Sequence, residues 1–300
     1  MSQSDLIEPW HIAGPGAIGL LLHSKLQQAT ESHLFPIMIH RSHQPAYDNY
    51  QVIDQDSTSL YPIHWFNQEQ VIHNLIITTK SYQVLDCITQ LIPFLSTEAN
   101  IVLLHNGLGI QQTAVKRWPA FNFFAGSTTE GAWKSEENKV IYAGQGETLI
   151  GSMSSNECLW WEKSSLSKAG FHWQENIMTQ LHTKVAINAA INPLTVLFEC
   201  QNGDLLTSEK RFSLMKTLCQ ETQTVLAKEG YPIDTLVDIV TQVAQRTGAN
   251  FSSSYQDWQH NRQTELSSMN GYIQSLAKKH KINTPVHDKV MEEVSLKALI

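Results

Sequence analysis

The sequence has few cysteines and lacks the common metal-binding motifs. Its 300 residues include four cysteines, at Cys87, Cys158, Cys200 and Cys219. No two of them have the CxxC spacing of zinc and redox sites, so we expect reduced thiols and neither kind of site. No HExxH sequence is present, so the histidines do not form the commonest helical zinc motif. We therefore expect no metal.

The chain also lacks the positive charge of nucleic-acid-binding proteins and the apolar segments of membrane proteins. It has 21 Lys and Arg against 28 Asp and Glu, a formal net charge of −7, which argues against general binding to nucleic acid or to an anionic membrane. No apolar stretch approaches the roughly 18 residues of a spanning helix. Residues 1–10 have no basic segment before an apolar one, unlike a secretory signal. We expect a cytoplasmic protein.

The first half of the chain has the pattern of a parallel β-sheet covered by helices. The length suits two domains, and short apolar segments that predict strands alternate here with stretches that predict helices. This alternation is typical of a βαβ domain with a parallel sheet. The expected strands are residues 10–13, 35–40, 75–79, 101–104, 121–125, 140–143 and 148–151, and the clearest expected helices are residues 20–29 and 82–95.

The second half has helical periodicity and few strand signals. We expect helices at residues 181–198, 211–230, 236–248 and 263–280, with Pro285 in a connection. The change of pattern places a domain boundary near residue 177. The sequence therefore predicts an α/β protein with a Rossmann-type domain at residues 1–177 and an all-helical domain at residues 178–300.

A glycine motif follows the first expected strand and opens the first expected helix. It reads Gly14-Pro15-Gly16-Ala17-Ile18-Gly19, which is GxGxxG. In this context the first glycine makes a tight turn and the second lets the backbone approach a pyrophosphate. The third permits close packing of helix on strand. The motif predicts dinucleotide binding. The alternative is a turn that is merely rich in glycine.

The residue after the second expected strand favours NADP(H) over NAD(H). An NAD site usually has an acidic residue there, whereas this chain has Arg41, and Asp48 lies past the strand. A guanidinium suits a 2′-phosphate because its planar donors form paired hydrogen bonds with phosphate oxygens. The alternative is that Arg41 is only an exposed loop charge.

Three polar residues share one face of the first long helix of the second half. Lys184, Asn188 and Asn192 are spaced four residues apart among apolar and small residues. A solvated stripe is the alternative, but asparagine is a poor helix former and suits a stripe that faces a cleft. Pro193 follows, and its missing N–H frees the carbonyl of Ala189. A lysine here suits the general acid of a ketone reduction, and the amides suit the hydroxyl and carboxylate groups of a small acid.

Together these motifs resemble the 2-dehydropantoate 2-reductase (ketopantoate reductase) family over nearly the whole chain. The matching segments are residues 14–19, 79–84, 105–109, 184–195, 202–203, 250–257 and 264–265. The resemblance implies NADPH-dependent reduction of 2-dehydropantoate to (R)-pantoate, a step in pantothenate and coenzyme A synthesis. It also implies a helical second domain like that of 6-phosphogluconate dehydrogenase.

The resemblance further implies roles for single residues, with Lys184 as the general acid and Glu265 as the acidic residue near the nicotinamide. The implied substrate-binding residues are Asn106, Lys184, Asn188, Asn192, Asn202 and Ser253. The implied cofactor-binding residues are Gly14, Pro15, Gly16, Ala17, Ile18, Gly19, Arg41, Lys80, Asn106, Ala132 and Glu265. Because Ser252 and Ser254 flank Ser253, the resemblance leaves open which of the three serines contacts the substrate.

Two other functions fit the same residues. One is reduction of another branched 2-keto acid by the same lysine, because specificity depends on the shape of the pocket. The other is a non-catalytic NADPH-binding regulator, which would need neither Lys184 nor Glu265. The partner in each case is a small molecule, and the sequence does not distinguish a monomer from a homodimer.

Overall fold

The computed structural model describes residues 8–41, 47–154, 161 and 164–297. Residues 1–7, which belong to the segment assessed for a secretory signal, and Cys158 lie outside the described residues. The chain divides into two compact units: Met1–His105 with Ile110–Ile177, and Asn106–Gly109 with Met178–Ile300. Within the described residues, no helix is long and apolar enough to cross a bilayer.

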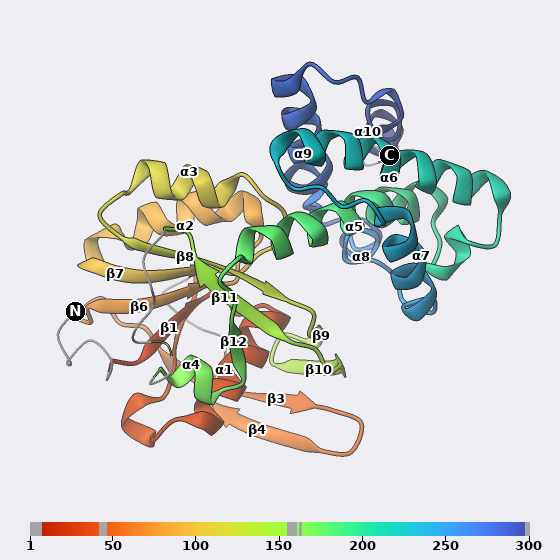
Figure 1. The fold of residues 1–300 in the computed structure, drawn as a ribbon. Helices are drawn as coiled ribbons and strands as arrows, with labels where there is room; N and C mark the ends of the chain where they lie inside the picture. Colours follow the sequence, from red (N-terminus) through yellow and green to blue (C-terminus); the bar gives the residue numbers. More distant parts are fainter. Residues whose placement is uncertain (1–7, 42–46, 155–160, 162–163, 298–300) are drawn as a thin grey trace. The chain divides into compact units, whose positions relative to one another are not determined.

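The first unit contains an eight-stranded sheet of order β12-β11-β8-β7-β6-β1-β2-β5 (Figure 1). All neighbouring strands are parallel except β8 and β11, which are antiparallel. The predicted fold class is confirmed, with this one pair making the sheet mixed. The strands are β1 (Trp10–Ala13), β2 (Ile37–Ile39), β5 (His64–Trp65), β6 (Ile72–Ile77), β7 (Leu95–Leu103), β8 (Asn122–Thr128), β11 (Thr148–Ser152) and β12 (Phe171–Trp173).

The central strands are apolar because helices cover both faces of the sheet. Successive residues alternate between two cores: Ile76 packs with the leucines of α1 (Ala17–Ala29), whereas Ile77 packs with Ile88 of α2 (Val84–Leu91). Ala114 of α3 (Ile110–Arg117) joins the second core. Each strand therefore buries side chains on both faces, which explains its nearly unbroken apolar sequence.

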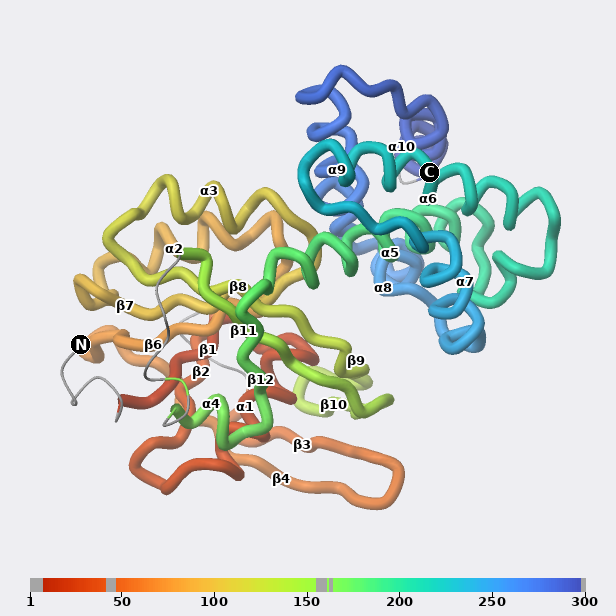
Figure 2. The backbone as a smooth tube through the Cα atoms, in the orientation of Figure 1, coloured from red at the N-terminus to blue at the C-terminus, as the bar shows by residue number. Residues whose placement is uncertain are grey.

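A four-stranded sheet of order β4-β3-β10-β9 forms the rest of the β structure of this unit. The β3–β4 and β9–β10 pairs are antiparallel, β3 and β10 are parallel, and β9 and β10 lie beside α1 (Figure 2). Only β10 corresponds to an expected strand, because the other three lack a continuous run of buried side chains. The strands are β3 (Asn49–Ile53), β4 (Thr58–Pro62), β9 (Gly131–Glu136) and β10 (Lys139–Gly144).

The order of strands brings the glycine motif to the reversal point of the large sheet. β1 lies between β2 and β6, so the chain moves outward from β1 on both sides. Ligands of such sheets bind outside the carboxyl ends of the strands at this reversal. The loop after β1 lies there, and the Gly14 amide donates to the Ile39 carbonyl over 3.4 Å.

The second unit is helical, as expected. Two of its helices differ from expectation: α8 was not predicted, and Pro285 begins α10 instead of lying in a connection. Proline suits a first helical position, and the next two amides donate to the Glu221 carboxylate over 2.9 Å. The helices are α5 (Ile177–Phe198), α6 (Glu209–Glu229), α7 (Leu236–Arg246), α8 (Ser253–Gln259), α9 (Leu266–His280) and α10 (Pro285–Lys297).

Candidate active site and cofactor loop

The glycine loop is held tightly at its two ends. Gly14 has φ +109°, and a Cβ there would lie 2.9 Å from the Thr79 backbone nitrogen. The Thr78 hydroxyl donates to the Gly14 carbonyl over 2.8 Å. A Cβ on Gly19 would lie 2.0 Å from that same carbonyl oxygen. Both glycines are therefore required for the turn and for the close approach of α1.

The middle of the loop is open, in contrast to its ends. A Cβ on Gly16 would meet no atom within 4 Å. Gly16 is also the N-cap of α1, where no side chain accepts a hydrogen bond from the first amides and the first turn has no acidic residue. An uncapped helix N-terminus next to open space suits an anion. The loop therefore fits the pyrophosphate of a dinucleotide.

The other predicted cofactor residues of the first unit lie on three separate strands or loops. Arg41 is exposed and follows β2, the neighbour of β1. Burial raises the pKa of the Cys87 thiol to about 11, and the charge of Arg41 opposes that rise. Lys80 lies in the turn after β6. Ala132 lies in β9 and packs against the core around α1.

One cation near the glycine loop was missed in the sequence. The Lys134 ammonium in β9 donates to the Pro15 carbonyl oxygen over 3.3 Å. Its position two residues after Ala132 would have identified it, because residues two apart share a face of a strand. The sequence of residues 131–136 did not predict a strand, so this relation between Ala132 and Lys134 could not be used.

In the second unit, Lys184 is partly buried on α5. Burial lowers the pKa of Lys184 to about 8, and the nearby charge of Glu265 works in the opposite direction. Glu265 itself is only 4% exposed and lies at the N-cap of α9. A lysine with this pKa is mostly protonated at neutral pH and gives up its proton more readily than an ordinary lysine.

The segment Asn106–Gly109 packs on the first turn of α9. Asn106 Nδ2 donates to Glu265 Oε2 over 3.1 Å, and the Leu108 amide donates to the Ser268 carbonyl over 2.9 Å. Gly107 has φ +88°, and a Cβ on it would lie 2.4 Å from the Ser268 side chain. These contacts orient Asn106 toward the carboxylate that acts on Lys184.

The two asparagines of the α5 stripe differ in their surroundings. Asn192 is 5% exposed and donates through Nδ2 to the Ser254 hydroxyl over 3.2 Å. Asn188 is partly exposed, and in the described ranges its side chain forms no hydrogen bond with the protein. Asn188 is therefore available to a ligand, whereas Asn192 also supports α8.

The structure separates the roles of the three serines before and in α8. Ser252 caps α8 by accepting from the Tyr255 amide over 3.0 Å, and its hydroxyl lies 2.7 Å from that of Thr195. Ser254 is buried and bonded to Asn192. Ser253 alone is exposed, so it is the serine among the three whose hydroxyl is accessible.

Asn202 lies in the turn before the short helix η6 (Gly203–Leu205) and is 8% exposed. Its Nδ2 donates to the Thr247 hydroxyl over 2.9 Å, and its Oδ1 is buried without a partner among the described residues. A hydrogen bond thus joins Asn106 to Glu265, and the charge of Glu265 acts on Lys184. Thr247 is a supporting residue that no pattern in the sequence indicated. Thr195 and Ser254 lie in the matching segments 184–195 and 250–257, but the sequence did not predict their supporting contacts.

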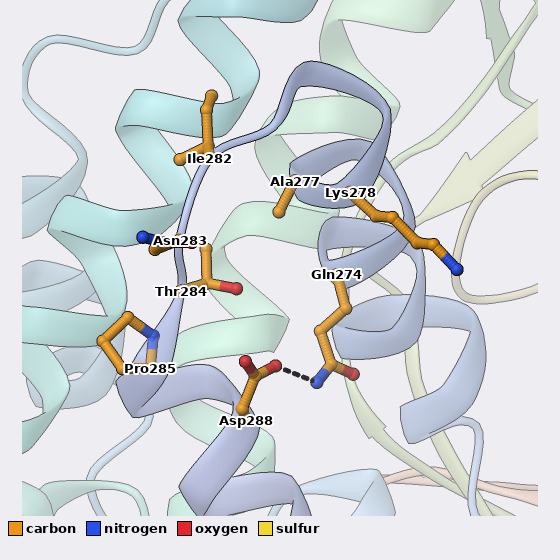
Figure 3. Close-up of a pocket in the computed structure, with 8 residues that line it drawn as sticks. All are labelled: Gln274, Ala277, Lys278, Ile282, Asn283, Thr284, Pro285 and Asp288. Atoms are coloured by element: carbon orange, nitrogen blue, oxygen red, sulfur yellow. Dashed lines mark hydrogen bonds between the residues drawn. The ribbon is translucent and has the colours of Figure 1, made fainter.

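A separate hollow of about 550 Å³ lies at the junction of α9 and α10 (Figure 3). Gln274 and Asp288 line it and are joined by a hydrogen bond of 2.7 Å from Gln274 Nε2. It contains none of the predicted site residues. Within the described residues, no three His, Cys, Asp or Glu side chains form a potential metal site.

Comparison with known proteins identifies the family of the chain. The family model described as ketopantoate reductase PanE/ApbA matches residues 10–155, and the model of its C-terminal part matches residues 176–298. The 2-dehydropantoate 2-reductase of Vibrio cholerae serotype O1 is 31% identical over 296 residues, which cover 94% of this chain and 95% of the relative.

Solved structures share the fold at lower identity. D-mandelate dehydrogenase, solved with NADH and anilino(oxo)acetate, has a TM-score of 0.86 at 21% identity and covers 97% of this chain and 98% of its own. A ketopantoate reductase of Ralstonia eutropha JMP134 has a TM-score of 0.86 at 20% identity, with the same coverage of each chain. The sequence matches span both units of the chain, which therefore belongs to the ketopantoate reductase PanE/ApbA family.

Proposed function

We propose that this protein reduces 2-dehydropantoate to (R)-pantoate with NADPH. The observation that carries the proposal is the Lys184–Glu265–Asn106 group, in which a lysine of pKa about 8 lies near a buried carboxylate bonded to an amide. Family membership supports the same reaction. We further propose that residues 1–177 bind the cofactor and that residues 178–300 bind the substrate and supply the acid.

The cofactor assignment rests on the fit of the glycine loop and of Arg41. The open Gly16 and the uncapped start of α1 suit a pyrophosphate. Arg41, at the end of β2, suits the 2′-phosphate that distinguishes NADPH from NADH. Lys80 is assigned to the cofactor by its place in the matching segment 79–84, and Ala132 by its position alone in the resemblance to the family. When bound, the nicotinamide supplies a hydride to the keto carbon of the substrate.

Lys184 provides the proton that the reduced carbonyl requires. As the carbonyl oxygen gains negative charge, an ammonium within hydrogen-bond distance stabilises it and then donates a proton. Burial makes that proton easier to give up, while Glu265 keeps the lysine charged near neutral pH. Asn106 holds the Glu265 carboxylate in place through its Nδ2 hydrogen bond.

The remaining polar groups orient the substrate. Asn188 and Ser253 have accessible polar groups that suit the hydroxyl and carboxylate of 2-dehydropantoate. Asn202 has a buried Oδ1 without a partner in the described ranges, and it can accept a hydrogen bond from a substrate hydroxyl. Asn192 contributes its amide while it also bonds to Ser254.

The test is the oxidation of NADPH by the purified protein with 2-dehydropantoate and a panel of other branched and aromatic 2-keto acids. We expect the highest kcat/KM with 2-dehydropantoate and (R)-pantoate as the product. A clear preference for another 2-keto acid would change the proposed substrate but leave the proposed reaction, a keto-acid reduction with Lys184 as the acid, unchanged. Tight NADPH binding without turnover of any member of the panel would instead indicate a regulator.

We also propose that the protein acts in the cytoplasm. Cys87, Cys200 and Cys219 are free thiols, and Cys200 and Cys219 are buried. A reducing compartment keeps such thiols free.

A further inference from the structure

Lys134, which lies outside the family motifs, contacts the glycine loop. Lys134 Nζ in β9 donates to the Pro15 carbonyl oxygen over 3.3 Å, and Pro15 lies between Gly14 and Gly16. The Lys134 ammonium has three donors, and the Pro15 carbonyl oxygen takes one of them.

The strand geometry directs Lys134 toward the loop. Ala132 packs against the core around α1, whereas Trp133 is 48% exposed on the opposite face. Residues two apart share a face of a strand, so Lys134 lies on the same side as Ala132. β9 lies directly beside α1 (Figure 2), and the lysine therefore reaches the start of that helix.

The ammonium of Lys134 forms no direct ion pair in the described part of the chain. Its other contact is the Tyr47 ring, whose centroid lies 5.9 Å away. Burial lowers the pKa of Lys134, and the more distant Glu137 opposes the change. Lys25 and Lys139, by contrast, form ion pairs with Glu130 and Glu136. A partly desolvated cation with only neutral contacts favours a bound anion.

The elements next to Lys134 indicate which phosphate of the cofactor would bind to it. The Gly14 amide donates to the Ile39 carbonyl, so the loop lies against the end of β2. Arg41 follows Ile39 by two residues, at the place where a Rossmann-type domain distinguishes the 2′-phosphate. Tyr47, the ring beneath Lys134, also lies in this region, because its carbonyl accepts from Trp65 Nε1 in β5, the neighbour of β2.

We propose that Lys134 binds the 2′-phosphate of NADPH together with Arg41 and so helps to select NADPH over NADH. This inference rests on the proposed function, because it requires that NADPH is the cofactor. Arg41 supplies a planar pair of donors from the end of β2, and Lys134 supplies a compact charge from β9. The pyrophosphate is left to the amides at the start of α1.

The experiment is calorimetric titration of the protein without substrate. NADPH, NADH, adenosine 2′,5′-bisphosphate and 5′-AMP are titrated into the wild type, Lys134→Gln, Lys134→Arg and Lys139→Gln. Lys139 is the matched control, because it lies in the adjacent strand β10 and is paired with Glu136 over 2.6 Å. Thermal melting of each variant shows whether it is folded.

We expect Lys134→Gln to weaken NADPH and the bisphosphate by about tenfold to a hundredfold, the range of a charged hydrogen bond. Binding of NADH and 5′-AMP changes less than about threefold on the same grounds, because neither has the 2′-phosphate. Lys134→Arg keeps most of the affinity, and Lys139→Gln binds like the wild type.

Two results would overturn the inference while the wild type binds NADPH. Unchanged NADPH affinity in folded Lys134→Gln would show that the lysine does not bind the cofactor. Equal losses for NADPH and NADH would assign it to the pyrophosphate instead. A wild type that binds NADH but not NADPH would refute the proposed cofactor itself, and this result is distinct from the other two.

Discussion

Asn270 Nδ2 donates a hydrogen bond of 2.8 Å to the carbonyl oxygen of Ala189. That carbonyl is the one that Pro193 deprives of its usual partner four residues later in α5. Asn270 lies in α9 and is fully buried. An amide from a second helix thus replaces the missing backbone donor, and it lets a proline lie inside the helix that carries Lys184, Asn188 and Asn192.

The first prediction concerns this replacement. Asn270→Ala leaves the Ala189 carbonyl without a donor, which should lower the free energy of unfolding by about 1–3 kcal/mol. Adding Pro193→Ala restores a backbone N–H, so the double variant should regain part of that loss. Chemical denaturation measures both, with exposed Asn283→Ala as the control. Additive effects of the two substitutions would mean that the amide and the proline are not coupled.

The second prediction concerns the proton donor. Lys184→Ala should lose at least about 100-fold in kcat, because positioned acid catalysis contributes about 10²–10⁴-fold. Binding of NADPH alone should be retained. Steady-state kinetics and titration measure the two effects, and Lys210→Ala, an exposed lysine of the same unit, is the control. A folded Lys184→Ala protein within about tenfold of wild-type kcat would mean that another group donates the proton.

The third prediction concerns pH. Burial lowers the pKa of Lys184 to about 8, and only the protonated form below that pKa can donate. The kcat/KM should therefore fall as the pH rises through about 8. Glu265 opposes the lowering of this pKa, so in Glu265→Gln the fall should begin at a lower pH. A pH–rate profile that is the same in both proteins would show that Glu265 does not influence the pKa of Lys184.

The fourth prediction concerns Arg41. Its replacement by alanine should raise the KM for NADPH and change that for NADH much less. The loss corresponds to a charged hydrogen bond of about 1.5–3 kcal/mol. Parallel kinetics with the two cofactors measure it, with Arg117→Ala in α3 as the control. Equal losses with both cofactors would show that Arg41 does not contact the 2′-phosphate.

The fifth prediction separates Asn188 from Asn192. Each alanine variant should weaken substrate binding and leave the affinity for NADPH alone nearly intact. Only Asn192→Ala should also lower Tm, because only Asn192 is bonded to Ser254. Substrate KM, NADPH titration and melting curves test the difference. Loss of NADPH binding in both folded variants would contradict the assignment of the stripe to the substrate.

Much of this fold is readable from the sequence, because its central strands are buried on both faces and its long helices are periodic. The strand–loop–helix around Gly14–Gly19 and the stripe on α5 are local patterns of spacing. The presence of Pro193 alone also predicted that the Ala189 carbonyl lacks its usual backbone donor. The identity of its new partner did not, because Asn270 lies 81 residues away in the chain.

The four-stranded sheet shows where local patterns fail. β4 has alternating exposed and partly buried residues, and β9 has a mixture of the two with no buried residue, so neither has the apolar run of a central strand. β4 and β9 form hairpins with β3 and β10, their neighbours in sequence, and the parallel pairing of β3 with β10 joins the two hairpins over a long stretch of chain. The contact of Lys134 with Pro15 follows from this pairing and could not be predicted without it.

The segment Asn106–Gly109 makes the helical unit discontinuous along the chain. A polypeptide that begins at Met178, the second residue of α5, would contain the helices of that unit but would lack these four residues. The Ser268 carbonyl would lose the Leu108 amide, and Glu265 would lose the Asn106 side chain. Recombination of the two units between relatives must therefore exchange this segment together with the helices, and a simple crossover at residue 177 would separate it from the surface that it fits.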